Sequence, residues 1–404
     1  MNIDEQLATL MQGTEYGDEQ LRRAMEAELR ERLIQAEKDG RKLRVYLGID
    51  PRTGDLHLGH TIQIRKLRQF QELGHNVTFV VGTYTSLIGD PSDKDKLRPQ
   101  LTSEQVDENA RTYAEQAFRV LDKEKTEVRY NGEWLSKLTF ADLIKFASHF
   151  TIQQFLTREN FHLRWEKGDP IYLHETFYAI MQAYDAYTLK ADVQVGGTDQ
   201  LFNIITAGRK LMEALGGKPN IGIIMGILPG TDGVIRMSKS LGNHIPINTT
   251  AEDMFGKVMS IPDAAMGIYM RMVTRWTAGD VAAKEKAMAD GSLHPREAKA
   301  DLAYEITEVF YTAKGAQRAR ESFDRIFQKG DTPEDIRVFT AKRGQPLLDV
   351  LLEAGLAKSK SEARRLIEQN GVRLDGAVIE DGNAPLAKGG VLQVGKRRFV
   401  RVEF

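Results

Sequence analysis

Short apolar stretches alternate with helical segments between residues 43 and 247, and this alternation constrains the fold more than any other feature of the chain. Strands are predicted at 43–49, 76–82, 127–130, 192–195 and 221–225, with helices between them. Strands that alternate with helices imply right-handed crossovers and a parallel sheet that is buried on both faces. Functional loops should then lie beyond the carboxyl ends of the strands.

The rest of the chain changes character twice. Strand signals fade after about residue 247, and a region rich in Ala, Glu, Lys and Met predicts a separate α-helical domain. Two short helices and glycine-punctuated strands then predict a small α+β module. We therefore expect an α/β protein with a Rossmann-like parallel-sheet domain and two further parts. The expected boundaries are 1–246 for N-terminal helices plus the sheet domain, 247–335 for the helical domain, 336–344 for a linker and 345–404 for the module.

Composition excludes several classes of protein. Of 404 residues, 41% are hydrophobic and 28% charged, as in globular proteins, and no apolar run approaches the ~20 residues that span a bilayer. The absence of cysteine excludes disulfides and thiolate metal sites and fits a reducing compartment. Residues 1–38 lack the pattern of a signal peptide, so we expect a cytoplasmic protein with no membrane partner. A net charge of -1 argues against a chain wholly dedicated to coating nucleic acid, but it allows a local basic patch.

The first chemically informative segment, 48–60, lies where the first predicted strand gives way to the first predicted helix. Helix N-termini attract phosphate through free N–H groups and the helix dipole. His57 and His60 are three residues apart and face the same side of the first turn, and Gly59 allows a flat nucleotide base to lie close to the backbone. Alone, this spacing is also compatible with a structural histidine pair or a chance metal site.

A second segment, Arg-Met-Ser-Lys-Ser at 236–240, lies in a polar loop after the last predicted strand of the sheet. Lys and Ser groups there could clamp the β- and γ-phosphates and neutralise charge on departing pyrophosphate, although an ordinary solvated loop has the same composition. Together and in this order, the two segments resemble the HIGH and KMSKS signatures of class I aminoacyl-tRNA synthetases. The resemblance implies ATP binding by His57, Gly59, His60, Asp199, Arg236, Met237, Ser238, Lys239 and Ser240.

A third segment concerns the amino acid. Tyr178, Gln182 and Asp185 stand at i, i+4 and i+7, hence on one face of a predicted helix that is otherwise largely apolar. A carboxylate among apolar neighbours is costly unless it gains a hydrogen-bond donor, and the phenol hydroxyl of a bound tyrosine would be such a donor. A partly exposed helix whose polar side faces water would show the same pattern.

Residues 178–185 (YAIMQAYD) and 194–200 (QVGGTDQ) resemble the paired tyrosine-pocket segments of bacterial tyrosyl-tRNA synthetases. The resemblance implies that Tyr46 and Asp185 bind the phenol hydroxyl, while Tyr178, Gln182 and Asp90 hold the α-ammonium group. The remaining amino-acid and ribose contacts would come from Asp50, Gln194 and Gln200. An acceptor built for the hydroxyl rejects phenylalanine, a selectivity for which the tyrosyl enzymes themselves are the standard example.

The loop that follows the second predicted strand contains an Asp-Pro-Ser turn signal and several basic residues. The resemblance implies that its cations reach pyrophosphate from one side and that the signature residues do so from the other. No nucleophile or general base is needed, because the substrate carboxylate attacks the α-phosphate in line and positioning with charge neutralisation suffices. We expect ATP as substrate, Mg²⁺ arriving with it, and no prosthetic group or protein metal site. The residues implied in this chemistry are His57, His60, Lys239, Lys94 and Arg98.

The C-terminal module carries a cluster of basic residues around its second predicted helix. Such a run usually marks a solvated helix face. Residues 363–376 nevertheless resemble the small RNA-binding module first described in a ribosomal small-subunit protein and found at the end of bacterial tyrosyl enzymes. Basic groups there would contact tRNA phosphates without reading sequence. The implied contacts are Lys358, Lys360, Arg364, Arg365 and Arg373.

The resemblance covers nearly the whole chain, with departures. Arg236 replaces the lysine that often opens the second signature, and it keeps the charge but not the compact ammonium geometry. Leu201 and Phe202 replace the Trp-Gly that follows in some relatives. The expected function is a homodimeric tyrosine-tRNA ligase that forms tyrosyl-adenylate and transfers tyrosine to tRNA(Tyr), with the helical domain binding the anticodon.

Three other functions compete with this prediction. A tryptophanyl enzyme shares the fold and both ATP signatures, but it should lack a carboxylate and a tyrosine placed for a phenol. A non-catalytic RNA-binding relative would not need the signature His and Lys residues that are intact here. A dinucleotide oxidoreductase is disfavoured because the first strand-to-helix turn lacks Gly-x-Gly-x-x-Gly.

Overall fold

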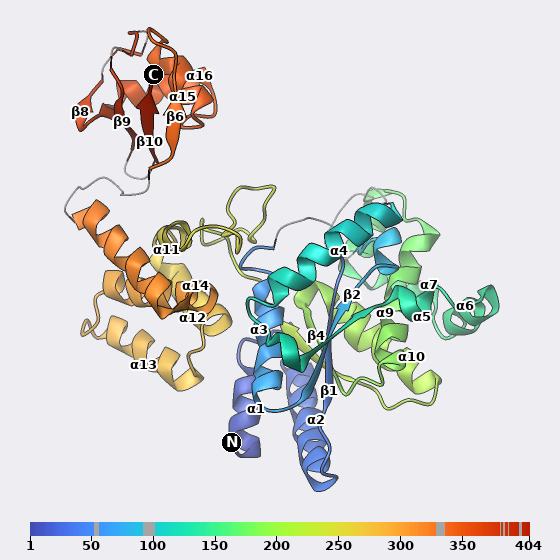
Figure 1. Ribbon diagram of the computed structural model, residues 1–404. Helices are drawn as coiled ribbons and strands as arrows, with labels where there is room; N and C mark the ends of the chain where they lie inside the picture. The colour runs from blue at the N-terminus through green and yellow to red at the C-terminus, as the bar shows by residue number, and fades with distance from the viewer. Residues whose placement is uncertain are drawn as a thin grey trace. The chain divides into compact units, whose positions relative to one another are not determined.

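A computed structural model describes residues 1–51, 56–91, 102–328, 336–379, 381–382, 384–386, 388–395 and 398–404. The chain divides into two compact units, residues 1–316 and residues 317–404 (Figure 1). Within the described ranges, no helix is both long enough and apolar enough to span a membrane.

The first unit is built on a five-stranded parallel sheet with the order β3-β2-β1-β4-β5. The order reverses direction between β1 and β4, and ligands of such sheets bind in the crevice beyond the strand ends at this switch point. The sheet confirms the predicted Rossmann-like domain, and each predicted strand is present within two residues of its expected bounds. The strands are β1 (Arg44–Ile49), β2 (Asn76–Val81), β3 (Thr126–Tyr130), β4 (Val193–Gly197) and β5 (Ile221–Met225).

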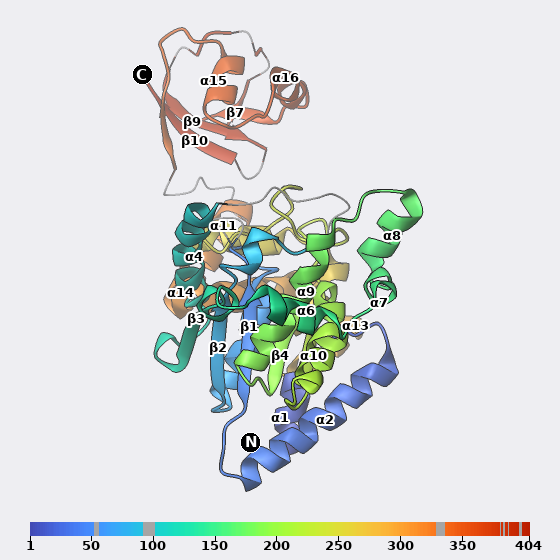
Figure 2. The same ribbon diagram turned by 90° about the vertical axis from the view of Figure 1, so that its right-hand side faces the viewer.

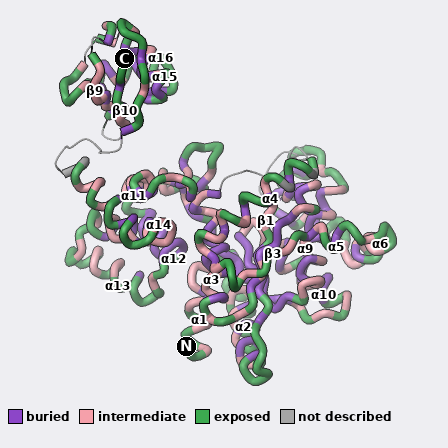
Figure 3. The backbone as a smooth tube through the Cα atoms, in the orientation of Figure 1, coloured by how far each residue is buried: buried purple, intermediate pink, exposed green. Residues whose placement is uncertain are grey.

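Helices cover both faces of this sheet (Figures 1 and 2). On one face lie α3 (Thr61–Glu72) and α4 (Ser103–Ala117), and on the other lie α9 (Leu173–Thr188), the π-helical η4 (Phe202–Gly208) and α10 (Arg209–Ala214). Strands β4 and β5 are buried along their whole length, as Figure 3 shows for the centre of the unit. Burial on both faces explains why β5, with the sequence IGIIM, contains no polar side chain, and why Gln194 is the only polar side chain in β4.

The N-terminal segment closes one edge of the sheet. Helices α1 (Ile3–Met11) and α2 (Glu19–Lys38) flank a short connection in which the Glu15 N–H donates to the Ile224 carbonyl oxygen at 2.8 Å. This bond pairs the connection with β5, which would otherwise present an unpaired strand edge.

Shorter elements complete the first unit. A helical region follows the sheet, and its last helix is interrupted at Thr312, where φ is 70°. The elements before the end of the sheet are η1 (Thr85–Leu87), η2 (Lys123–Lys125), α5 (Gly132–Leu135), α6 (Phe140–Ala147), α7 (Ile152–Leu156), α8 (Glu159–Lys167) and η3 (Thr198–Gln200). Those after it are α11 (Ala251–Met259), η5 (Asp263–Ala265), α12 (Met266–Val273), α13 (Ala278–Ala289) and α14 (Pro295–Gln328), the last of which runs into the second unit.

The second unit contains a small mixed sheet with the order β6-β10-β9-β7-β8. Buried aliphatic side chains of the two helices pack against those of the central strands. This arrangement confirms the predicted α+β module. Its elements are β6 (Val338–Thr340), α15 (Leu347–Glu353), α16 (Lys360–Glu368), β7 (Val372–Leu374), β8 (Ala377–Val378), β9 (Gly390–Val394) and β10 (Arg398–Glu403).

Candidate active site

A cavity of about 270 Å³ opens at the carboxyl ends of β1 and β4, where the strand order reverses. Its position is the one that the parallel sheet predicts for a ligand site. Most of the residues expected to bind amino acid or ATP line it. These are Tyr46, Asp50, His60, Asp90, Tyr178, Gln182, Asp185, Asp199, Gln200 and Arg236.

One end of the cavity is defined by Asp185 on α9, whose side chain is 4% exposed. The Trp134 indole N–H donates to its Oδ1 at 2.7 Å, and the Asn131 amide donates to its Oδ2 at 3.2 Å. Burial raises the pKa of Asp185 to about 7, against the opposing effect of these two donors. A carboxylate has about four acceptor positions, so Asp185 can still accept from a ligand.

Tyr46 on β1 lies beside this carboxylate and is buried. Its hydroxyl approaches the Gln182 backbone carbonyl at 3.5 Å. Burial and the charge of Asp185 raise the pKa of Tyr46 well above its usual value, so the phenol remains protonated. Tyr46 and Asp185 therefore offer a hydroxyl and a carboxyl to the same end of the cavity.

A second carboxylate, Asp50, follows β1 and is held from both sides. The Tyr178 hydroxyl donates to its Oδ2 at 3.1 Å, and the Thr85 hydroxyl donates to its Oδ1 at 2.7 Å. Thr85 in turn accepts from the Asn131 amide at 3.0 Å. Asn131 thus links the Asp50 and Asp185 carboxylates, since it also donates to the latter.

A third carboxylate, Asp90, anchors a chain of hydrogen bonds. Arg158 and the Gln200 amide donate to its two oxygens, the first at 3.2 Å. The Asn203 amide then donates to Gln200 Oε1 and to Gln182 Oε1, both at 3.0 Å. This chain joins three of the predicted amino-acid contacts, Asp90, Gln182 and Gln200, into one network.

The rings of the two histidines of the first signature are in contact, with centroids 3.8 Å apart and planes tilted by 35°. Burial lowers the pKa of His57 to about 2, with His60, His244 and Arg236 adding repulsion, and it lowers the pKa of His60 to about 4. Both rings are therefore uncharged at neutral pH and can act only as neutral hydrogen-bonding groups. His60 lines the cavity, whereas His57 is not among its lining residues.

The second signature is held by Asn243, which the sequence did not single out. Its Oδ1 accepts from the Ser238 N–H at 2.8 Å, and its amide donates to the Arg236 carbonyl at 3.2 Å and to the Asp232 carboxylate. Arg236 and Lys239 remain exposed, while Met237 is buried. The loop therefore has a hydrogen-bonded frame and two solvent-exposed cations, of which Arg236 also lines the cavity.

The two signatures lie next to each other in space. The Leu58 N–H donates to the Ile245 carbonyl at 2.8 Å, and the Ile247 N–H donates to the Leu56 carbonyl at 3.2 Å. These bonds pair the chain around the first signature with the chain just after the second. The two motifs, which are far apart in the sequence, are thus neighbours at the carboxyl end of the sheet.

Some predicted residues lie elsewhere. Gln194 is buried on β4 outside the cavity lining, and its Oε1 accepts from the Asn220 amide at 2.9 Å. Gly59 does not line the cavity, and a Cβ there would meet the His57 ring at 3.1 Å. Lys94 and Arg98 lie outside the described residues.

The sequence did not identify several residues that support the cavity. Trp134 and Asn131 follow β3, where Asn-Gly looks like an ordinary turn signal. Arg158 precedes a surface helix, and Asn203 lies in the π-helical η4, a class of element that often occurs at functional sites. No local pattern marks these side chains, because their partners are distant in sequence.

The five basic residues predicted to contact RNA are all exposed on the second unit. Lys360 pairs with Asp349 at 2.8 Å, whereas Arg364 and Arg365 form no ion pair among the described residues. Arg373 lies on β7 next to the buried Val372, so strand alternation directs it to the sheet face away from the helices. The predicted RNA contacts therefore belong to two surfaces.

A parallel sheet of this order, with a His-x-x-His turn after its first strand and a basic loop after its last, defines a class I aminoacyl-tRNA synthetase. A family model described as tRNA synthetases class I (W and Y) matches residues 38–328, and an S4 domain model matches residues 345–392. The tyrosine–tRNA ligase of Thermotoga maritima is 46% identical over 374 residues, 92% of this chain and 93% of the relative. That of Oleidesulfovibrio alaskensis is 44% identical over 406 residues, 100% and 99% of the two chains. The chain belongs to the tyrosine–tRNA ligase family.

Solved structures share the fold. The mitochondrial tyrosyl-tRNA synthetase of Aspergillus nidulans has a TM-score of 0.64 at 22% identity, covering 80% of this chain and 94% of that chain. The enzyme from Archaeoglobus fulgidus, complexed with L-tyrosine, has a TM-score of 0.60 at 22% identity, covering 79% and 100%. Family membership confirms the prediction of an enzyme of this class and favours tyrosine over tryptophan as its amino acid.

Proposed function

We propose that the cavity binds tyrosine with its phenol hydroxyl between Tyr46 and Asp185. The observation that carries the proposal is a buried carboxylate whose pKa burial raises to about 7, next to a protonated tyrosine at one end of a cavity. A substrate hydroxyl that donates to Asp185 favours its ionised form. Phenylalanine would leave that carboxylate without the donor, and an unpaired buried polar group opposes binding.

The α-ammonium group is assigned to the other predicted contacts. Asp90 supplies a carboxylate whose two oxygens are already oriented by Arg158 and Gln200. Tyr178 and Gln182 lie on the same face of α9 as Asp185 and line the same cavity. A molecule of tyrosine would thus be held at both ends by groups on one helix and the loops that face it.

ATP would lie against the two signatures. The tyrosine carboxylate attacks the α-phosphate, the α–β phosphoanhydride bond breaks, and pyrophosphate leaves with the negative charge. Arg236 and Lys239 supply exposed positive charge, and Lys94 and Arg98 are proposed to supply more. The neutral His57 and His60 would donate hydrogen bonds rather than charge.

Mg²⁺ would enter as part of the ATP substrate. Within the described residues there is no group of three His, Cys, Asp or Glu side chains that could hold a metal ion, so phosphate oxygens would supply most of its ligands. We place the reaction in the cytoplasm, where tRNA charging supports protein synthesis.

The tRNA would be bound by the helical segment that follows the sheet and by the C-terminal module. The S4 match at residues 345–392 includes α16, and the exposed Arg364 and Arg365 on that helix suit phosphate contacts. The helical segment 247–335 is proposed to bind the anticodon. Transfer would then esterify the terminal ribose of the tRNA with the activated tyrosine.

The test is ATP–pyrophosphate exchange with each standard amino acid, for wild type and Asp185→Asn. Tyrosine alone should drive exchange, and the variant should lose its preference for tyrosine over phenylalanine. Asp192→Asn is the matched control, because Asp192 is equally buried but bonds Arg32 and Arg41 at the opposite ends of the strands. Exchange driven by tryptophan, or full discrimination by Asp185→Asn, would overturn the proposal.

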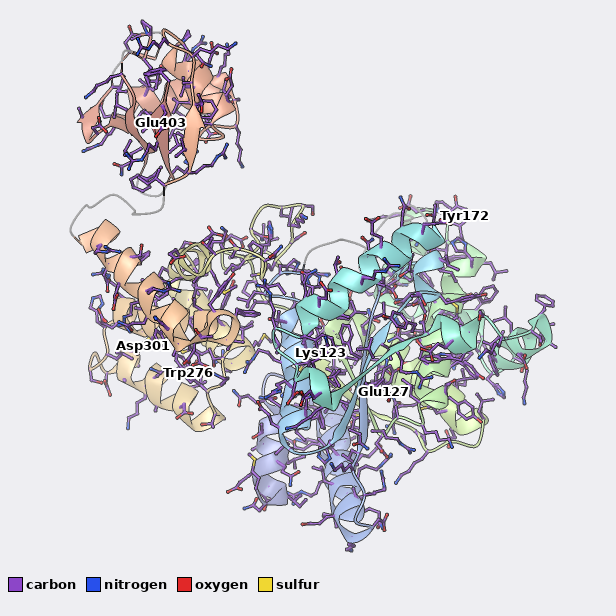
Figure 4. All side chains as sticks on the ribbon, viewed as in Figure 1. Lys123, Glu127, Tyr172, Trp276, Asp301 and Glu403 are labelled. Atoms are coloured by element: carbon purple, nitrogen blue, oxygen red, sulfur yellow. The ribbon has the colours of Figure 1, made fainter. Side chains whose placement is uncertain are left out.

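A homodimer is also proposed, on the evidence of exposed apolar side chains. Figure 1 shows α6 and α7 at the side of the first unit away from α3, and Trp165 on α8 is 65% exposed. Tyr172, labelled in Figure 4, is 45% exposed. Clustered exposed apolar side chains mark interfaces. The members of this apolar face are Phe140, Ile144, Ile152, Leu163, Trp165, Tyr172 and Leu173.

Sedimentation equilibrium of the full chain tests the dimer. Phe140→Glu and Trp165→Glu should convert a dimer to a monomer, because a buried unpaired carboxylate opposes association. Val338→Glu places the same charge at an exposed apolar position of the second unit and should leave the dimer intact. A monomeric wild type, or dimers of both face variants, would contradict the proposal.

A further inference from the structure

Helix α8 begins at a buried arginine that reaches the candidate amino-acid site from outside the cavity. Arg158 is the N-cap residue of α8, is 5% exposed, and is absent from the cavity lining. Its Nη2 lies 3.2 Å from Oδ1 of Asp90, which does line the cavity. An arginine so placed can act on a ligand only through the carboxylate that it holds.

The guanidinium of Arg158 is itself fixed by aromatic rings. It lies 5.3 Å from the ring centroid of Phe161 and 5.9 Å from that of Phe202, within the range of cation–π attraction. Phe161 belongs to α8, whereas Phe202 belongs to η4, which follows Gln200. The planar group therefore ties the start of α8 to the segment that directly follows Gln200, the second donor to Asp90.

The first turn of α8 holds the same loop a second time. The Asn160 amide donates to the backbone carbonyl of Pro91, directly after Asp90. Asp90 is thus restrained through its side chain by Arg158 and Gln200, and through its neighbouring backbone by Asn160. Such a carboxylate loses little rotamer freedom when it binds a cation, which favours affinity.

We propose that Arg158 is a positioning residue that holds the Asp90 carboxylate in the orientation that receives the α-ammonium group of the amino acid. The inference rests on the proposed role of Asp90. Arg158 holds Oδ1 and Gln200 holds Oδ2 of a carboxylate that lines the cavity. Lysine cannot replace it fully, because an ammonium group lacks the planar fork and stacks poorly.

The same helix provides a matched control. Arg164 is 3% exposed and also lies over Phe161, at 5.8 Å, but it pairs with Glu175 at 2.6 Å and makes no described contact with Asp90. Loss of either arginine removes a buried cation from α8. Only the loss of Arg158 should act on an ammonium group in the cavity.

The experiment measures Arg158→Met, Arg158→Lys and Arg164→Met in tyrosine-dependent pyrophosphate exchange, with folding checked by circular dichroism. Two competitive inhibitors are compared, tyramine and 4-propylphenol, which differ in that the first has an ammonium group where the second has a methyl group. Arg158→Met should raise the KM for tyrosine and the inhibition constant of tyramine by about tenfold or more, with little change for 4-propylphenol or in the KM for ATP. Arg158→Lys, which also serves if the Met variant does not fold, should recover part of the loss.

A tyramine affinity that is unchanged in the Arg158 variants overturns the inference. So does an equal loss for both inhibitors, or the same pattern in Arg164→Met, since either result means that α8 is only a structural support. Asp90→Asn separates this failure from that of the proposed site. If Asp90→Asn still binds tyramine in preference to 4-propylphenol, the proposed ammonium site itself is wrong. If Asp90→Asn loses this preference but Arg158→Met keeps it, only the positioning role of Arg158 is refuted.

Discussion

Replacing Trp134 with phenylalanine should change the pH at which the enzyme uses tyrosine. The indole N–H donates to Asp185 at 2.7 Å, and this bond stabilises the ionised carboxylate. The pKa of Asp185 is already raised to about 7 by burial, so its ionisation is balanced near neutral pH. Phenylalanine fills most of the same volume but donates no hydrogen bond. The Asp185 carboxyl group should therefore have a higher pKa in the variant than in wild type.

The size of the effect follows from the strength of one bond. A hydrogen bond to a charged group contributes about 1.5–3 kcal/mol, and one pH unit corresponds to about 1.4 kcal/mol, so the pKa of Asp185 should rise by about one to two pH units. At pH 7 the ionised fraction would fall from roughly one half to somewhere between about one tenth and one hundredth. If tyrosine donates its hydroxyl to the carboxylate, kcat/KM for tyrosine falls by a similar factor and recovers at higher pH.

The assay is pyrophosphate exchange between pH 6 and pH 9, with kcat/KM for tyrosine determined at each pH. Wild type should rise with a midpoint near the pKa of Asp185, and Trp134→Phe should rise with a higher midpoint. Trp276→Phe makes the same substitution at a residue whose ring stacks on Lys284 at 4.5 Å, away from the cavity (Figure 4). Superimposable profiles for wild type and Trp134→Phe would refute the view that this donor controls the carboxylate.

Asn243→Ala should lower kcat in pyrophosphate exchange by about tenfold or more with little change in the KM for tyrosine, because the second signature loses its hydrogen-bonded frame. Gly230→Ala should have the same effect, since its Cβ would lie 2.2 Å from the Asn243 amide, whereas Gly256→Ala meets nothing within 4 Å and should be silent. Burial lowers the pKa of Lys66 from 10.5 to about 7. Between pH 7 and pH 10.5 the unfolded chain therefore binds more protons at this residue than the folded protein does, so Lys66 makes the free energy of unfolding rise with pH in that range. Urea denaturation at pH 7 and pH 9 should show that contribution in wild type and lose it in Lys66→Met.

The parallel sheet could be predicted from sequence because its strands carry a local signal. The segment 221–225 is short and apolar, as double burial requires, and 192–195 alternates valine with polar residues; each is followed by a helix or a polar loop. The i, i+4, i+7 spacing placed Tyr178, Gln182 and Asp185 on one helix face, and all three line the cavity.

The supporting contacts could not be predicted in the same way. Trp134 is separated from Asp185 by 51 residues, and Arg158 from Asp90 by 68, so each pair meets only after the sheet has assembled. Gln194 illustrates the reverse case. Its amide is of the kind that binds polar ligands, but its Oε1 accepts a hydrogen bond from Asn220. No feature of the local sequence predicts that partner.

Selectivity in this cavity depends on elements outside the sheet core. The proposed ATP site consists of the strands and the two signatures, which other class I enzymes share, so these elements cannot by themselves choose tyrosine. Asp185 accepts a hydrogen bond from Trp134, which belongs to α5, and Asp90 accepts one from Arg158, the N-cap of α8. Both donors lie between β3 and β4, in the long crossover that also carries the exposed apolar side chains of α6 to α8. If Asp185 and Asp90 hold the two ends of tyrosine as proposed, this crossover is where the amino-acid preference is set.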